Sequence, residues 1–367
     1  MRAIAIAMVV MAHAMFVFKG YSNSFLDILH IFGFLGVEIF FVLSGFLIGD
    51  MLFKLFKSKK VSFKDLKYFW IRRWFRTLPL YFLFLIVNIL IALSTGFELP
   101  KSLWKYPLFL QNFSGTHITF FPESWSLSVE EYAYLLAPIT LFLFYMLLQK
   151  ALKVYKEKIF LLASIFLAVV FLISKVVYHI NHDDTLQDLE FWNSNLKAIV
   201  IYRLDAIFYG FILVYYFETY KGFIKKMRNK MLFIGLVLLF LTIVFIPSFG
   251  MTIQKHPWYW NVAYLPLNSL AIAMILPYLF YLETSRAFIK KTIQNISVFS
   301  YSMYLFHYTC LLYLMDILID FEGLSLVYRV FWALVYVFLT YVCSTLLYKY
   351  FEKPMTDLRD NFRIRNL

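Results

Sequence analysis

The chain of 367 residues has little charge and almost no cysteine. Asp, Glu, Lys and Arg together make up 16% of it, against about a quarter of a typical soluble domain. The two cysteines, Cys310 and Cys343, both lie in long apolar runs. Neither a disulfide framework nor a cysteine-based metal site is therefore expected.

Several catalytic and nucleotide-binding motifs are also missing. The sequence has no Gly-x-Ser-x-Gly turn, no glycine-rich Walker loop, and no His-x-x-x-His or Cys-x-x-Cys pair. Serine hydrolase, ATP-driven and metal-dependent functions therefore have no support. We expect no metal site and no permanently bound cofactor.

Apolar residues dominate instead. The chain is 62% hydrophobic and 21% aromatic, which is typical of a polytopic membrane protein. We predict an all-α fold with about ten transmembrane helices and no soluble domain. The predicted spans are 3–18, 28–53, 78–94, 129–148, 159–178, 198–217, 231–249, 261–282, 297–319 and 326–348.

Two features qualify this prediction. The first stretch also resembles a signal peptide, with Ala12-His13-Ala14 as the cleavage site, but the many later spans favour a first transmembrane helix. The segment 99–128 is aromatic and holds three prolines, so no clean span is expected there. One membrane domain is predicted over 1–355, followed by a short basic cytoplasmic tail over 356–367.

Basic residues are concentrated in alternate loops. The basic stretches are 54–76, 150–158, 221–230, 286–291 and 349–365. The other loops are poor in Lys and Arg, and one holds an acidic run from Asp183 to Glu190. Because cytoplasmic loops are the basic ones, we predict a multi-pass protein of the inner (plasma) membrane with both termini cytoplasmic. The net charge of +13 is then mostly an orientation signal, with membrane lipid as the surroundings and no nucleic-acid partner.

Arg2 and His13 share one face of the first predicted helix. Eleven residues at 100° each return to nearly the same direction, and the rise is about 16 Å. With Arg2 at the cytoplasmic mouth and His13 deep, this face suits a ligand with an anionic end and a long arm. The alternative is a positive-inside anchor and a packing histidine.

A second cluster lies between Trp70 and Arg76. On a helix Arg72, Arg73 and Arg76 are three or four residues apart, so we expect them to converge. Convergent guanidinium groups suit phosphate. A basic loop facing anionic lipid is the alternative.

The run from Ser124 to Tyr132 opens the fourth span at its outer side. Ser126 or Ser128 could cap the helix while a glutamate satisfies first-turn donors. The functional alternative is that Glu130 meets a hydroxyl acceptor arriving from outside.

Other ionisable groups inside apolar runs are costly and are candidates for substrate binding. They are Glu38, Arg203, Asp205 and His307. Arg203 and Asp205 are two residues apart and point in nearly opposite directions, so each needs a partner on another helix. Structural ion pairing, or for His307 a place in the core, is the alternative.

These residues fall in motifs that occur together in one family. The motifs are Arg2 with His13, Gly36 to Ile48, Arg72 to Tyr81, Trp125 to Glu131, Arg203 to Gly210, Ser300 to His307 and Phe351 to Pro354. In this order they resemble acyltransferase family 3, the integral membrane acyltransferases of bacterial surface glycans and related acceptors. The resemblance implies a ten-helix domain that uses a cytoplasmic acyl-CoA, usually acetyl-CoA.

The resemblance also assigns roles and shows departures. Arg2 with His13 matches the family's arginine–ten residues–histidine motif, and Arg73 with Arg76 matches its arginine-x-x-arginine motif. Glu38 stands where aspartate is common. Only Met1 precedes Arg2, so we expect either almost no leader or a start farther upstream. The chain ends about a dozen residues past Pro354, so any hydrolase-like domain is expected on another polypeptide.

The predicted function is O-acyl transfer from acyl-CoA to a hydroxyl of a carbohydrate or lipid-linked glycan on the outer side. His13 and Glu130 would be catalytic. Arg2, Arg72, Arg73 and Arg76 would hold the donor, with Ser126 and the buried charged groups as further binding residues. A flippase for a lipid-linked sugar and a non-catalytic scaffold are the alternatives. The acceptor and the oligomeric state cannot be read from the sequence.

Overall fold

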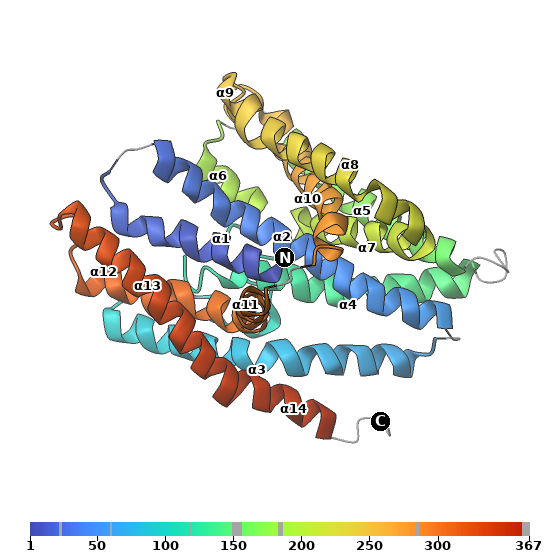
Figure 1. The fold of residues 1–367 in the computed structure, drawn as a ribbon, viewed down its shortest axis with the longest axis horizontal. Coiled ribbons are helices and arrows are strands. Elements are labelled where there is room, and N and C mark those ends of the chain that lie inside the picture. Colours follow the sequence, from blue (N-terminus) through green and yellow to red (C-terminus); the bar gives the residue numbers. More distant parts are fainter. Residues whose placement is uncertain are drawn as a thin grey trace.

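The computed structural model describes residues 1–21, 24–58, 61–117, 119–148, 156–182, 186–283 and 286–361. Within these ranges every regular element is a helix. Figure 1 shows the long helices packed into one elongated bundle. The predicted all-α fold is therefore confirmed.

The elements follow one another in this order, with η marking 3₁₀ and π segments. They are α1 (Arg2–Ala14), η1 (Met15–Phe18), α2 (Ser24–Ser58), α3 (Phe63–Thr95), η2 (Leu103–Leu108), α4 (Ser124–Leu148), α5 (Lys156–Asn181), α6 (Leu189–Trp192), η3 (Asn193–Lys197), η4 (Val200–Tyr202), α7 (Leu204–Thr219), α8 (Lys221–Phe240), η5 (Leu241–Phe245), α9 (Ile246–Ser248), η6 (Tyr259–Tyr264), α10 (Leu265–Phe280), α11 (Ala287–Phe306), η7 (His307–Tyr313), α12 (Leu314–Leu318), α13 (Leu326–Leu347), η8 (Tyr348–Glu352) and α14 (Lys353–Asn361).

Seven helices in the described ranges are long and apolar enough to cross a membrane. They are Ile31–Ser58, Phe63–Thr95, Ser124–Leu148, Lys156–Asn181, Lys221–Ser248, Tyr259–Phe280 and Leu326–Arg359. The remaining three predicted spans are also helical. However, Arg2–Phe18 is a shorter apolar helix, α7 has 16 residues, and α11 is not among the seven. The count of ten spans stays a prediction.

Helix α3 begins fifteen residues before the predicted span 78–94. Ser62 and Asp65 form a capping box, in which the backbone N–H of Ser62 donates to the Asp65 carboxylate at 2.9 Å. This cap starts the helix within a polar stretch that hydropathy alone does not mark. Gly96 ends it with φ 72°, a left-handed conformation that glycine adopts readily. The arginines of 72–76 therefore lie on a helix and not in a loop.

Helix α2 packs closely against α1 and α7. A Cβ at Gly45 would overlap the carbonyl oxygen of Ile207, and one at Gly210 would overlap the carbonyl oxygen of Val42. Because backbone atoms cannot move aside as side chains do, both positions need glycine for α2 and α7 to touch. This contact fixes the centre of the bundle.

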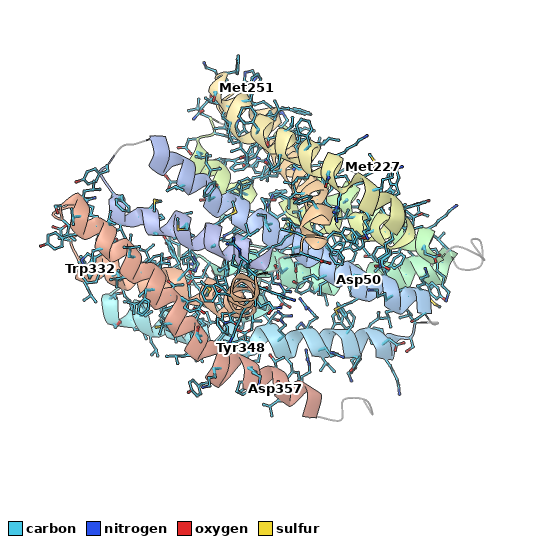
Figure 2. All side chains as sticks on the ribbon, in the orientation of Figure 1. Asp50, Met227, Met251, Trp332, Tyr348 and Asp357 are labelled. Atoms are coloured by element: carbon cyan, nitrogen blue, oxygen red, sulfur yellow. The ribbon has the colours of Figure 1, made fainter. Side chains whose placement is uncertain are left out.

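The outer helices are much less buried. In the apolar window of α8 only 11% of the residues are buried inside the protein, against 56% in the window that includes α10. Figure 2 shows side chains projecting outward from these peripheral helices, with Met227 on α8 and Trp332 on α13 labelled. An apolar surface of this kind is expected to face lipid.

Some predicted features fall outside the described residues. They are Lys59, Lys60, Lys150, Lys153, Asp183, Asp184 and the last part of the tail, 362–367. The described start of the tail is helical, because α14 extends to Asn361.

Candidate functional site

Three arginines line a small cavity between α1, α2, α3, α4 and α11. Arg2 comes from α1, and Arg73 and Arg76 come from α3. Glu130 and Tyr134 of α4 complete the polar part of the wall, and the volume is about 80 Å³. We call this the arginine cavity. Its polar wall brings together residues of α1, α3 and α4.

The guanidinium groups of this cavity lack enough acceptors. The Glu130 carboxylate accepts a hydrogen bond from the Tyr134 hydroxyl at 2.6 Å, and Arg73 lies 4.6 Å from the centre of the Tyr134 ring. Nε of Arg73 is buried without a hydrogen-bond partner in the described ranges. The side chains of Arg2 and Arg76 make no hydrogen bond to any other described residue. Unfilled guanidinium donors at low dielectric favour an anionic ligand.

A second carboxylate lies near this cluster. Glu352, at the end of η8, accepts a hydrogen bond from the Ser302 hydroxyl of α11 at 2.5 Å. It is close enough to interact electrostatically with Arg2 and Arg76. Glu131 of α4 likewise interacts electrostatically with Arg73. The wall of the cavity itself is lined by three guanidinium groups and one carboxylate, that of Glu130.

Arg72 does not join the other arginines, so the predicted convergence of all three residues is wrong. Its guanidinium group donates to the Tyr68 hydroxyl at 3.1 Å and lies over the Tyr68 ring. Arg73 and Arg76 are three residues apart and share one face of α3. Arg72 is rotated by about 100° from Arg73 and finds a partner one turn back on its own helix.

A larger cavity surrounds the two histidines. His13 of α1 and His307 of η7 line it, together with Glu123 and His117 from the segment before α4 and Lys197 at the end of η3. Its volume is about 420 Å³, within the usual range for small-molecule sites. We call this the histidine cavity.

The two histidines form a directed hydrogen-bonded pair. Nδ1 of His307 lies 2.7 Å from the carbonyl oxygen of Tyr304, so it carries the hydrogen. Nε2 of His307 must then accept, and it lies 3.2 Å from Nδ1 of His13. Nδ1 of His13 also lies 2.9 Å from the carbonyl oxygen of Val9, so it too is protonated. This leaves the lone pair of neutral His13 on Nε2, where a general base needs it.

The two cavities meet at Tyr304. Both Tyr304 and Val37 line each of them. The hydroxyl of Tyr304 is 2.6 Å from that of Ser126, which lines the arginine cavity. The interpretation that Ser126 or Ser128 caps this helix is wrong, because α4 already begins at Ser124. A reacting group at this junction would contact both cavities.

The predicted Arg2–His13 face is present, but its depth differs from expectation. The two residues line different cavities along α1. Figure 1 shows the N-terminal end of α1 near the middle of the bundle. Arg2, at the start of α1, thus lies beside a cavity that α2, α3, α4 and α11 also line.

The structure also separates Glu130 from His13. Glu130 lines the arginine cavity, whereas the carboxylate that lines the histidine cavity is Glu123. Seven residues along α4 are a rise of about 10 Å, which places the two carboxylates two turns apart. The predicted catalytic role of Glu130 stays a prediction, since the carboxylate that shares a cavity with His13 is that of Glu123.

Glu123 is a site residue that sequence reasoning missed. It is 6% exposed, and its carboxylate accepts hydrogen bonds from the Thr309 hydroxyl at 2.9 Å and the Thr309 backbone N–H at 3.4 Å. Burial raises the pKa of Glu123 to about 7. Its spacing from Ser126 and Glu130, three and seven residues, marks one helical face and could have identified it.

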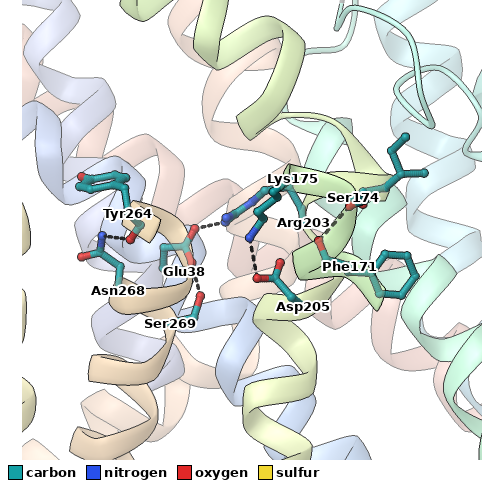
Figure 3. Close-up of polar contacts among 10 residues, drawn as sticks. Glu38, Phe171, Ser174, Lys175, Arg203, Asp205, Tyr264, Asn268 and Ser269 are labelled. Carbon is teal, nitrogen blue, oxygen red and sulfur yellow. Dashed lines mark hydrogen bonds and ion pairs between the residues drawn. The ribbon is translucent and has the colours of Figure 1, made fainter. Parts of the chain in front are cut away.

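Four other buried charged residues form two ion pairs away from both cavities. Figure 3 shows Arg203 paired with Glu38, and Lys175 paired with Asp205 at 2.5 Å. The Ser269 hydroxyl also donates to Glu38 at 3.0 Å. The prediction that Arg203 and Asp205 need separate partners is confirmed. Neither they nor Glu38 line the arginine or histidine cavity, so the structure favours ion pairs that join α2, α5 and α7.

Comparison with known proteins adds to this geometry. A family model described as the acyltransferase domain of acyltransferase family 3 matches residues 1–349. The chain is 24% identical over 345 residues to O-acetyltransferase OatA of Staphylococcus aureus, which covers 88% of this chain and 52% of that protein. It is 33% identical over 127 residues to peptidoglycan O-acetyltransferase OatA of Listeria monocytogenes, 30% of this chain and 20% of that protein.

The chain thus spans about half the length of the Staphylococcus aureus relative, and less of the other. No solved structure matches it. These similarities lend no support to the flippase alternative. Since the family match extends over nearly the whole sequence and several helices can cross a membrane, the chain belongs to acyltransferase family 3 as a multi-pass membrane protein.

Proposed function

We propose that the chain is an O-acyltransferase that moves an acetyl group from acetyl-CoA to a hydroxyl of a cell-envelope glycan. The observation that carries this proposal is the junction of two unlike cavities at Tyr304. One is small and cationic, and the other is larger and contains a histidine pair with a basic nitrogen. The names of the relatives, two O-acetyltransferases, point to the same reaction.

The arginine cavity would bind the donor. A volume of about 80 Å³ holds only a few waters, so it admits the acyl thioester end and not a nucleotide. Arg2, Arg73 and Arg76 would attract the CoA phosphates at the opening of this cavity. The thioester carbonyl would then lie near Ser126 and Tyr304.

His13 would act as the general base. The acceptor hydroxyl oxygen attacks the thioester carbonyl carbon while its proton passes to Nε2 of His13. When the C–S bond breaks, the thiolate of CoA leaves and takes the proton back from His13. His307 would accept a stronger hydrogen bond from Nδ1 of His13 while that ring is protonated. The acyl group ends on the acceptor oxygen, and no external oxidant or metal is needed.

The hydroxyl pair at the junction would stabilise the tetrahedral intermediate. Tyr304 and Ser126 are both buried and 2.6 Å apart. One of the two hydroxyls donates its hydrogen to the oxygen of the other. The accepting hydroxyl keeps its own hydrogen, which it can donate to the developing oxyanion. A donor of this kind is worth about 100- to 1,000-fold in kcat in other acyl-transfer enzymes.

The sidedness follows from the basic loops. The stretches before α3, in the first half of α8 and in α14 are rich in Lys and Arg, so they would face the cytoplasm, where acyl-CoA is made. The acceptor would reach the histidine cavity from the outer side of the plasma membrane. Transfer across the membrane would then need only the acyl group to pass the junction.

The test is transfer with purified full-length chain and radiolabelled acetyl-CoA. His13→Ala should lower CoA release and glycan labelling by about 100-fold or more. The matched control is His256→Ala, an exposed histidine outside both cavities. Full activity of His13→Ala would refute the proposal. Label retained on rapidly desalted wild-type protein but absent from His13→Ala would instead indicate an acyl-histidine intermediate.

A further inference from the structure

One wall of the histidine cavity is cationic without an anionic partner. Lys197 ends η3 and lines the cavity. Its ammonium group lies 5.5 Å from the centre of the Phe34 ring. Among the described residues, no carboxylate forms an ion pair with it. A cation held against an aromatic face in a cavity, with no counter-ion, is a site prepared for an anion.

His117 provides a second unfilled group on the same wall. Its Nδ1 is buried and has no hydrogen-bond partner in the part of the chain that the structure describes. Burial, together with the nearby charge of Lys197, lowers the pKa of His117 to about 4. The ring is therefore neutral at pH 7, with one nitrogen as a donor. Burial also lowers the pKa of Lys197 to about 8, so its charge persists at neutral pH.

Hydrogen bonds join the two backbone segments that form this wall. The N–H of His117 donates to the carbonyl oxygen of Ser194 at 2.9 Å. The Asn112 side chain donates to the carbonyl oxygen of Ala198 at 2.5 Å, and the N–H of Val200 donates to the carbonyl oxygen of Asn112 at 2.9 Å. The segments 111–117 and 193–200 are thus held in one position, which a specific binding wall needs.

Among the described residues one carboxylate lines this cavity, and it belongs to another part of the wall. The Glu123 carboxylate accepts a hydrogen bond from the Thr309 hydroxyl of η7, on the side of the histidine pair. Lys197 instead comes from η3 and faces Phe34 of α2. The carboxylate of Glu123, on the side of His13, and the ammonium group of Lys197 thus lie on different parts of the cavity wall.

We propose that the histidine cavity selects an acceptor glycan with an anionic group, a carboxylate or a phosphate, bound by Lys197 and His117 with Asn193 and Ser194. This rests on the proposed function, since it names the class of acceptor for the same site. Binding the anion at this wall would orient the sugar so that a neighbouring hydroxyl faces His13. A neutral glycan would leave Lys197 without a partner and would bind more weakly.

The test measures binding separately from activity. Three oligosaccharides serve as probes: one ending in a uronic acid, its carboxyl-reduced neutral twin, and one ending in a sugar phosphate. Wild-type chain in detergent should bind at least one anionic probe about 10- to 100-fold more tightly than the neutral twin. The preferred anionic probe tells carboxylate from phosphate.

Variants assign the preference to a residue. Lys197→Gln should bind the charged and neutral probes equally, whereas Lys197→Arg keeps the charge and should retain most of the preference. The control is Lys255→Gln, an exposed lysine outside the cavity, which should change nothing. Thermal melting of each variant checks folding.

Three results would overturn the inference. They are equal or undetectable binding of all probes by the wild type, an anion preference that survives in Lys197→Gln, and a rise in the acetyl-CoA KM of Lys197→Gln in place of weaker probe binding. CoA release is recorded on the same preparations. Anion-selective binding without CoA release would refute the acyl-transfer proposal but not the anion site.

Discussion

Replacing His307 with alanine tests the histidine pair. In the structure Nε2 of His307 accepts from Nδ1 of His13 at 3.2 Å. The carbonyl oxygen of Val9 remains as a second acceptor at 2.9 Å. A hydrogen bond to a charged group contributes about 1.5–3 kcal/mol. Because Val9 keeps part of this stabilisation, we expect the lower end of that range, a fall in kcat of about 10- to 30-fold.

The KM for acetyl-CoA should not change, because His307 lines the histidine cavity and not the arginine cavity. The assay is CoA release at varied acetyl-CoA, with thermal melting to check folding. His307→Gln should recover part of kcat, since its amide oxygen can accept from His13. His256→Ala is the control.

The pair of kinetic constants separates this role from a structural one. If the substitutions merely caused misfolding, His307→Ala and His307→Gln would both lose active molecules. Their melting temperatures would fall in parallel with that loss. Full kcat in His307→Ala, or an unchanged kcat with a raised acetyl-CoA KM, would refute the role of His307 beside the base.

Three further predictions concern the donor site, a buried carboxylate and helix packing. Arg73→Ala should raise the acetyl-CoA KM about 10- to 100-fold, whereas Arg72→Ala, outside the cavity, should change it by about twofold at most; equal effects in the steady-state assay would contradict the assignment. Since burial raises the pKa of Glu123 to about 7, its ionisation lowers stability as pH rises from about 4.5 to 7. Glu123→Gln should therefore melt higher than wild type at pH 8 and gain less at pH 5, and a constant difference would refute this. Gly45→Ala should lower the melting temperature, with a cost of about 1–3 kcal/mol or more from overlap with backbone. Gly222→Ala, which meets open space, is its control, and equal melting of the two would contradict the packing argument.

The existence of the helices could be predicted from apolar runs, but several of their ends could not. The predicted spans 78–94 and 129–148 begin later than α3 and α4 do. Hydropathy marks only the apolar part of a helix. The polar first turns of α3 are set by the Ser62–Asp65 cap, and those of α4 by packing against α11 and the segment before it.

Part of the site also followed from spacing. Arg2 with His13 and Arg73 with Arg76 are pairs on single helices, where the 100° step fixes which residues share a face. The error for Arg72 arose because three neighbouring arginines cannot all face one cavity.

The rest of the site depends on tertiary contacts. Lys197 and His117 lie in short irregular segments whose course is set by bonds such as that from Asn112 to Ala198. No periodic pattern in the sequence places such segments beside α1. Tyr304 was visible in a motif, but its position between two cavities emerges only when α4 and α11 are packed together.

The central claim is that donor and acceptor enter separate cavities from opposite sides of the membrane. It is tested most directly in sealed vesicles that contain the reconstituted chain, with radiolabelled acetyl-CoA outside and cell-wall oligosaccharides trapped inside. The account predicts acetylated oligosaccharide inside, none with His13→Ala, and little label when both substrates are outside. Labelling only when both substrates share one side would contradict it.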